Sequence, residues 1–131
     1  MPPRSIAMAT GPEGGAYDAI GKRYKAILAR AGVQLRLVST SGALENLALL
    51  RDPHSGVSVA LLQGGITSEA DAPEIASLGT VFYEPLWLFH RGELRMQGLE
   101  GLRGHKISIG LEGGASRALY LELLKRSGRW Q

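Results

Sequence analysis

The first 62 residues alternate between short apolar runs and longer amphipathic stretches, and this alternation constrains the fold more than any other feature. Residues 4–10, 33–39 and 57–62 are apolar or alternating runs bounded by turn residues, which predicts strands. The apolar side chains of residues 17–31 recur at helical spacing, and residues 42–51 form a second helical stretch. Because parallel strands need crossover connections, this order favours an α/β fold, with a mostly parallel sheet and helices on both faces.

The segment after the third predicted strand carries further β-like runs. Residues 75–83 and 86–90 predict two more strands around Glu84 and Pro85, where the proline fits an edge or a bend rather than a central strand. We therefore assign residues 1–92 to one α/β lobe.

A second unit begins after a charged stretch that is punctuated by glycines. This stretch, residues 93–105, predicts a hinge or linker with a short helical piece. Residues 106–110 then predict a strand and residues 116–127 a helix. Since one strand and one helix cannot bury a core of their own, residues 106–131 are expected to be the incomplete start of a second lobe.

Composition excludes several classes of protein. Of the 131 residues, 44% are hydrophobic and 21% charged, as in ordinary globular proteins. The formal net charge is only +3 with scattered basic residues, so a nucleic-acid partner is not expected. The chain has no cysteine, which excludes disulfides and thiol chemistry, and no apolar run reaches the ~20 residues of a membrane helix.

The tetrapeptide Glu-Gly-Gly-Ala occurs twice, each time after a strand-like run and before a helix-like one. Loops at the carboxyl ends of parallel strands face the ligand crevice, and helix N-termini favour anions. Alternatively, these glycines only make tight turns. Candidate ligand-binding residues at the strand ends are Gly11, Gly14, Gly15, Tyr17, Ser41, Gly42, Gln63, Gly113, Gly114 and Ser116.

Catalytic and metal-binding patterns are sparse. His54, His90 and His105 are isolated, so we expect no metal site and no cofactor. Glu13 and Glu112 are expected to face solvent, because a glutamate would repel an anion beside it. As catalytic groups, only the hydroxyls of Tyr17, Ser41 and Ser116 are available, and Ser41 or Thr40 is equally suited to cap the second helix.

Four motifs, taken together and in order, resemble the TAXI family, the solute-binding proteins of tripartite ATP-independent periplasmic (TRAP) transporters. The motifs are ATGPEGGAY at residues 9–17, SGALENL at 41–47, YEPLWL at 83–88 and LRGHKISIG at 102–110. The resemblance implies a type II periplasmic-binding-protein fold with two α/β lobes around a cleft. It also implies a small carboxylate ligand, such as glutamate, glutamine or a related dicarboxylate, and TRAP membrane subunits as partners.

The resemblance carries expectations about location and assembly. It implies a periplasmic or otherwise extracytoplasmic protein whose leader is removed before Met1, and hinge closure near residues 91–98. Family members are roughly twice as long, so we expect most of the second lobe to be missing here and a homodimer to form through residues 106–131. A ligand-sensing domain of a regulator and an enzyme on the same two-lobed fold remain alternatives, although no catalytic activity is expected.

Overall fold

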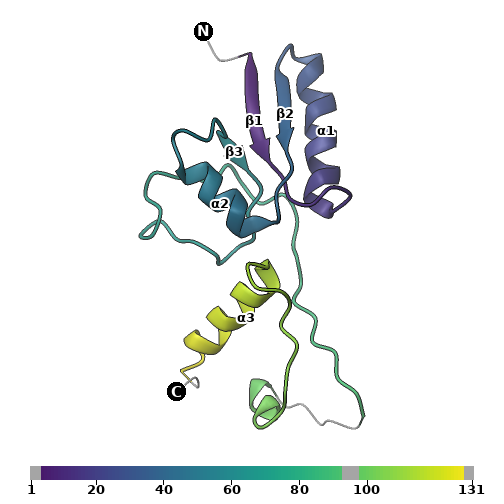
Figure 1. The fold of residues 1–131 in the computed structure, drawn as a ribbon, viewed down its shortest axis with the longest axis vertical. Coiled ribbons are helices and arrows are strands. Elements are labelled where there is room, and N and C mark those ends of the chain that lie inside the picture. Colours follow the sequence, from purple (N-terminus) through teal and green to yellow (C-terminus); the bar gives the residue numbers. More distant parts are fainter. Residues whose placement is uncertain (1–3, 93–97, 129–131) are drawn as a thin grey trace.

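The computed structural model describes residues 4–92 and 98–128 of the chain (Figure 1). Within these ranges the chain forms three short strands, three α-helices and one 3-10 turn. In order they are β1 (Ser5–Ala9), α1 (Ala16–Arg30), β2 (Gln34–Val38), α2 (Ala43–Arg51), β3 (Val59–Ala60), η1 (Leu99–Leu102) and α3 (Ala115–Arg126).

The strands form one parallel sheet in the order β2-β1-β3. β1 pairs with β2 over its whole length, from Ser5 opposite Gln34 to Ala9 opposite Val38. It pairs with β3 only at its end, where Ala9 lies opposite Ala60. The predicted α/β class, the parallel sheet and the first three strands are therefore confirmed, although β3 is much shorter than the predicted run.

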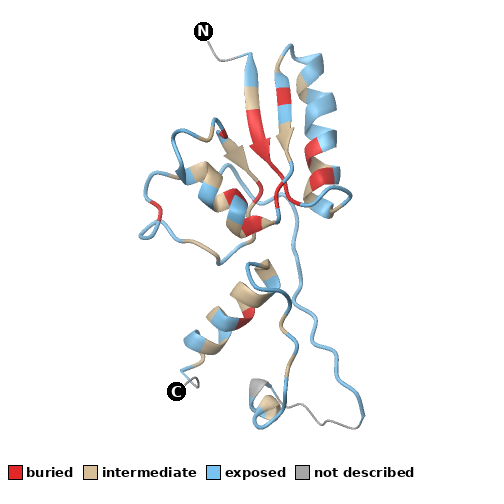
Figure 2. Ribbon diagram, viewed as in Figure 1, coloured by how far each residue is buried: buried red, intermediate tan, exposed pale blue. Residues whose placement is uncertain are grey.

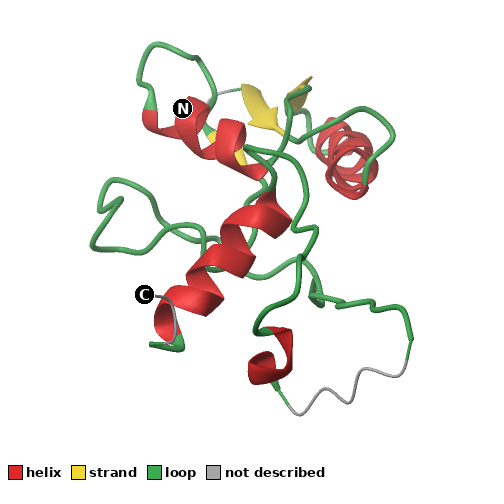
Figure 3. Ribbon diagram, turned by 60° about the horizontal axis from the view of Figure 1, so that its bottom comes forward, coloured by secondary structure: helices red, strands yellow, loops and turns green. Residues whose placement is uncertain are grey.

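The strand order determines where the helices lie. The chain passes from β1 outward to β2 and then back across β1 to β3. Right-handed crossovers in these two opposite directions place α1 and α2 on opposite faces of the sheet (Figure 3). The prediction of helices on both faces of the sheet is therefore confirmed, with one helix on each face.

Helix α1 lies close to the sheet at a glycine. A Cβ on Gly21 would lie 2.7 Å from Thr10 Cγ2 and 3.2 Å from Leu37 Cδ2, so only glycine allows this approach. The apolar stripe predicted for this helix is only partly covered, since Tyr24 is 38% and Ile27 58% exposed. Because the small sheet ends at β2, it covers only part of that stripe.

The core is small and centres on β1, whose last three residues are buried on both faces (Figure 2). Leu35 of β2 and Ala43 of α2 are each 2% exposed, and Val57 and Leu61 lie on either side of β3. Small side chains fill the centre, which allows the helices to lie close to so short a sheet.

Three further strands predicted from the sequence, at residues 75–83, 86–90 and 106–110, do not form. Residues 76–92 are exposed throughout and lack regular structure (Figure 2). A strand exists only when a neighbouring strand pairs with it, and no backbone hydrogen bond of the described residues joins these segments to the sheet or to one another. Pro85 also removes one backbone donor from the middle of the stretch.

The carboxy-terminal helix α3 begins one residue before its predicted start and lies apart from the sheet (Figure 1). Its Tyr120 is 8% exposed, and Leu119 Cδ1 lies 3.8 Å from the position of a Cβ on Gly65. Helix α3 is therefore next to the loop that follows β3. Residues 93–97 of the predicted hinge lie outside the described residues, while the short helical piece predicted beyond them is present as η1.

Candidate functional site

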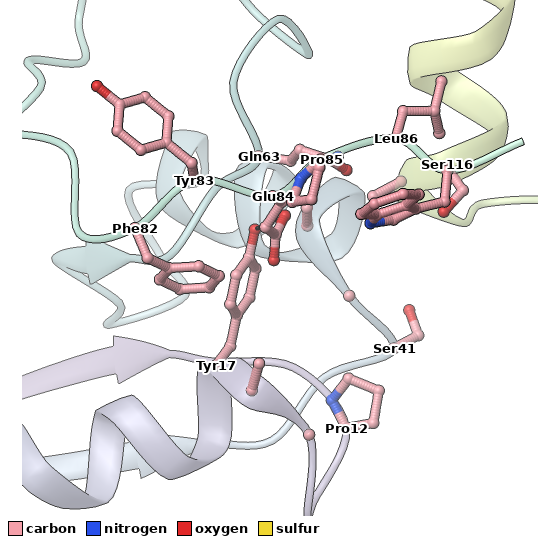
Figure 4. Close-up of a pocket in the computed structure, with 16 residues that line it drawn as sticks. Pro12, Tyr17, Ser41, Gln63, Phe82, Tyr83, Glu84, Pro85, Leu86 and Ser116 are labelled. Carbon is pink, nitrogen blue, oxygen red and sulfur yellow. Dashed lines mark hydrogen bonds between the residues drawn. The ribbon is translucent and has the colours of Figure 1, made fainter.

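An open cleft of about 630 Å3 lies at the carboxyl ends of the strands (Figure 4). Segments that follow each strand line it, together with residues 82–87 and the start of α3. The strand order reverses direction at β1, between β2 and β3, and ligands of open α/β sheets bind at such a switch point. The cleft therefore lies where the topology favours a binding site.

The predicted site residues divide into two groups. Those that line the cleft are Gly15, Tyr17, Ser41, Gly42, Gln63 and Ser116. Those that do not line it are Gly11, Gly14, Gly113 and Gly114. The structure thus brings together residues from both ends of the chain, about a hundred positions apart in sequence.

The two Glu-Gly-Gly-Ala sequences form the same turn. The amide of Gly15 donates to the carbonyl of Pro12 at 3.1 Å, and that of Gly114 donates to the carbonyl of Leu111 at 3.0 Å. The third residue of each turn is a glycine with φ of +78°, as a type II turn requires. The turn geometry alone explains why glycines are needed at these positions. Each turn leads directly into a helix that begins at the cleft.

Three helix N-termini meet at this cleft. Residues 15–17 at the start of α1, 42–43 at the start of α2 and 115–116 at the start of α3 all line it. Each helix begins after a glycine, and in the described part of the chain none of the three has a side-chain capping bond. The first-turn amides of each helix have no intrahelical acceptor, so each N-terminus presents donors and a partial positive charge.

The helix caps differ from those predicted. Gly42, rather than Thr40 or Ser41, is the N-cap of α2. The Ser41 amide and hydroxyl donate instead to the Glu45 carboxylate, at 2.6 and 2.7 Å, and these bonds lower the pKa of Glu45. Thr40 donates its hydroxyl to Asn46 Oδ1. Both hydroxyl groups are therefore used in fixing the loop that leads into α2.

A buried asparagine, which the sequence analysis did not identify, ties the strand ends together. Asn46 of α2 has no exposed surface, and its Nδ2 donates to the carbonyls of Thr10 at 2.9 Å and Leu61 at 2.8 Å. These carbonyls belong to the residues that directly follow β1 and β3. Asn46 lies three residues after Ala43 and so on the same face of the helix, which was the available signal of its burial. Nothing in the sequence, however, distinguishes a buried amide from an exposed one.

Tyr17 projects from α1 into the cleft and contacts the segment that crosses it (Figure 4). Its hydroxyl donates to Glu84 Oε2 at 3.3 Å, and its ring meets that of Phe82 edge-on at 6.0 Å. Burial, the negative charge of Glu84 and this hydrogen bond raise the pKa of Tyr17 to about 12. The hydroxyl is therefore protonated at neutral pH and acts as a donor.

Residues 82–83 and 86–87 were predicted to belong to two strands on either side of Glu84 and Pro85, and residues 82–87 instead form one continuous part of the cleft wall. Only Pro85 had marked this stretch as irregular. The apolar alternation that predicted strands reflects aromatic side chains at the cleft rather than a buried sheet face.

The charged side chains near the first loop do not line the cleft. The Asp18 carboxylate accepts from Lys22 at 2.7 Å and from the Gly14 amide at 2.9 Å, and these two bonds lower the pKa of Asp18. Glu13 and Glu112 are exposed and do not line the cleft, as predicted.

No metal site emerges in residues 4–92 and 98–128. No three His, Asp or Glu side chains of these ranges gather closely enough to hold a metal ion. The Tyr17 hydroxyl donates to Glu84 and the Ser41 hydroxyl to Glu45, so each of these predicted hydroxyl groups already has a carboxylate partner. No helix in the described ranges is both long and apolar enough to span a membrane.

Comparison with known proteins gives no relative: no family model, curated protein or solved structure matches the chain.

Proposed function

We propose that this chain is the first lobe of a solute-binding protein that captures a small carboxylate at the cleft described above. The observation that carries the proposal is the convergence of three N-termini, those of α1, α2 and α3, on one cleft at the topological switch point. Backbone donors and helix dipoles together favour an anionic group there.

The chemistry of the cleft supports binding rather than turnover. Apart from Glu84, the described side chains that line it are neutral, and the Gln63 amide supplies a donor that orients a ligand. The extracytoplasmic location and the TRAP transporter partner belong to the same proposal and rest on the resemblance of the sequence motifs. So does the type II periplasmic-binding-protein fold, of which the three-stranded sheet would be one lobe.

The ligand is expected to contact both ends of the chain. Because Ser116 of α3 lines the same cleft as residues 15–17, a bound carboxylate would link the first lobe to the second unit. Closure near residues 91–98 would then shield it from water and strengthen the helix contacts.

A charge placed at a helix N-terminus tests the proposal. Ala16 is the first residue of α1, is exposed and lines the cleft, so Ala16→Asp puts a carboxylate where the ligand would bind. A carboxylate at this position is favourable for the helix itself, so the variant is expected to fold. We expect calorimetric titration with a panel of amino acids and dicarboxylates to show that Ala16→Asp binds at least about tenfold more weakly than the unaltered chain.

Ala19→Asp provides the matched control, because Ala19 lies one turn further along α1, is exposed and does not line the cleft. It is expected to leave the affinity unchanged. Equal affinities of Ala16→Asp and Ala19→Asp for the panel would contradict the site, and the absence of any binding by the unaltered chain would contradict the function.

A further inference from the structure

A carboxylate lies inside a cleft that we assign to a carboxylate ligand. Glu84 is the only charged side chain among the described residues that line it. The Tyr17 hydroxyl occupies Glu84 Oε2 at 3.3 Å, while in the described part of the chain Oε1 has no hydrogen-bond partner (Figure 4). One oxygen of this carboxylate is therefore open to a ligand.

Aromatic side chains share the cleft with this carboxylate. The Tyr17 hydroxyl donates to it, Phe82 meets the Tyr17 ring edge-on, and Trp87 lines the cleft further along the same segment. Ring faces attract cations, and a carboxylate beside them attracts the same charge. The set of one carboxylate and several rings is the chemistry that recognises an ammonium group.

No basic side chain in the described ranges lines the cleft, so a ligand cation would meet no like charge there. The nearest ammonium on α1, that of Lys22, is paired with Asp18 at 2.7 Å. A ligand with two negative charges would place one of them against Glu84. A ligand with one carboxylate and one ammonium group would instead satisfy both parts of the cleft.

We propose that Glu84, with the rings of Tyr17 and Phe82, forms a subsite for the ammonium group of a zwitterionic solute whose carboxylate lies at the helix N-termini. This inference rests on the proposed function and narrows its ligand class from small carboxylates, dicarboxylates included, to those that also carry an ammonium group. The ammonium can be primary, as in an α-amino acid, or quaternary, as in a betaine.

The test is calorimetric titration of the full chain with alanine, glycine betaine and succinate, in parallel with Glu84→Gln. We expect the unaltered chain to bind one of the two zwitterions more tightly than succinate. Glu84→Gln should weaken zwitterion binding roughly five- to tenfold, because it removes a charge pair at a partly exposed site. The same substitution should leave succinate binding unchanged or make it tighter.

Glu69→Gln is the matched control, since Glu69 is exposed and lies outside the cleft. It should reproduce the affinities of the unaltered chain, and circular dichroism should show the same helix content for both variants. Phe82→Leu distinguishes the two kinds of ammonium, because loss of a ring weakens the binding of a quaternary group more than that of a primary one.

Two results would overturn the subsite while leaving the carboxylate site intact: tighter binding of succinate than of either zwitterion, or equal zwitterion affinities for Glu84→Gln and the unaltered chain. Absence of binding with all three solutes would overturn the subsite and the proposed function together.

Discussion

Replacing Asn46 by alanine should remove most of the stability of this fold, although Asn46 is a single polar side chain on a nine-residue helix. Its amide donates to the carbonyls of Thr10 and Leu61 and accepts from the hydroxyl of Thr40. These three residues are 1%, 8% and 8% exposed, so water does not readily replace the lost partner. Alanine therefore leaves three buried polar groups unpaired.

The magnitude follows from the cost of each unpaired group. A buried polar group that loses its partner costs about 1–3 kcal/mol, so three of them cost about 3–9 kcal/mol, and overlap between neighbours favours the lower half of that range, about 3–6 kcal/mol. Small domains are stable by about 5–15 kcal/mol in total. The variant is thus expected to be marginally folded or unfolded at room temperature.

The assay is urea unfolding followed by far-ultraviolet circular dichroism, with stability extrapolated to water. Thr40→Val gives a graded measurement in case Asn46→Ala does not fold, because it removes only the hydroxyl donor to Oδ1 and should cost about 1 kcal/mol. Gln34→Ala is the control, since Gln34 is an exposed amide on β2 and its loss should change stability by less than about 0.5 kcal/mol.

A loss below about 1 kcal/mol for Asn46→Ala, at an unchanged denaturant slope, would refute the reasoning. It would mean that the ends of β1 and β3 stay together without the amide, or that water enters and satisfies the two carbonyls.

The remaining predictions concern the glycines and Tyr17. Gly21→Ala should destabilise the chain by about 1–2 kcal/mol in urea unfolding, since a methyl group would lie 2.7 Å from Thr10 Cγ2; a stabilised variant would show that α1 does not lie so close to the sheet. Gly14→Ala and Gly113→Ala should each cost about 1 kcal/mol, because both glycines have φ of +78° and a Cβ there meets no atom within 4 Å; unequal costs would show that the two turns are not equivalent. Tyr17 should titrate near pH 12 in an absorbance titration at alkaline pH, and Tyr17→Phe should remove this phase. Since its folded-state pKa exceeds the ordinary value of 10.0, the contribution of Tyr17 to stability is complete below about pH 10 and is lost as the pH rises toward 12; a titration near 10 would show that the contact with Glu84 does not persist.

The sequence predicts the elements that are defined by local patterns. Helix α1 follows from the recurrence of apolar residues between Gly15 and Gly32, and β1 and β2 follow from short apolar runs that end at turns. The two matching turns, one before α1 and one before α3, were also visible in the sequence as a repeated tetrapeptide. What these features share is that a few neighbouring residues determine them.

Features that depend on a partner could not be predicted. Residues 75–90 have strand-like composition, but a strand needs a neighbouring strand to pair with. The sequence of the segment does not show whether such a neighbour exists. The position of Glu84 against Tyr17 joins residues that are 67 positions apart, and periodicity gives no information about such a contact. The burial of the apolar stripe of α1 was likewise overestimated, because the width of the sheet determines how much of the stripe is covered.

The stability of this small fold and the position of its cleft depend on the same few atoms. Asn46 does not line the cleft, yet the carbonyls it holds belong to Thr10 and Leu61. The loop after Thr10 leads into α1, which carries Tyr17, and the loop after Leu61 carries Gln63, and both side chains line the cleft. The amide also fixes the start of its own helix through Thr40, and Gly42 opens onto the same space. A buried polar residue is costly in a core this small unless every bond is satisfied, and within the described residues no buried side-chain nitrogen or oxygen lacks a partner. The cleft at the strand ends is therefore positioned by a paired polar centre rather than by the extent of the apolar core, which explains how so short a sheet can fix the loops that lead into α1 and α2.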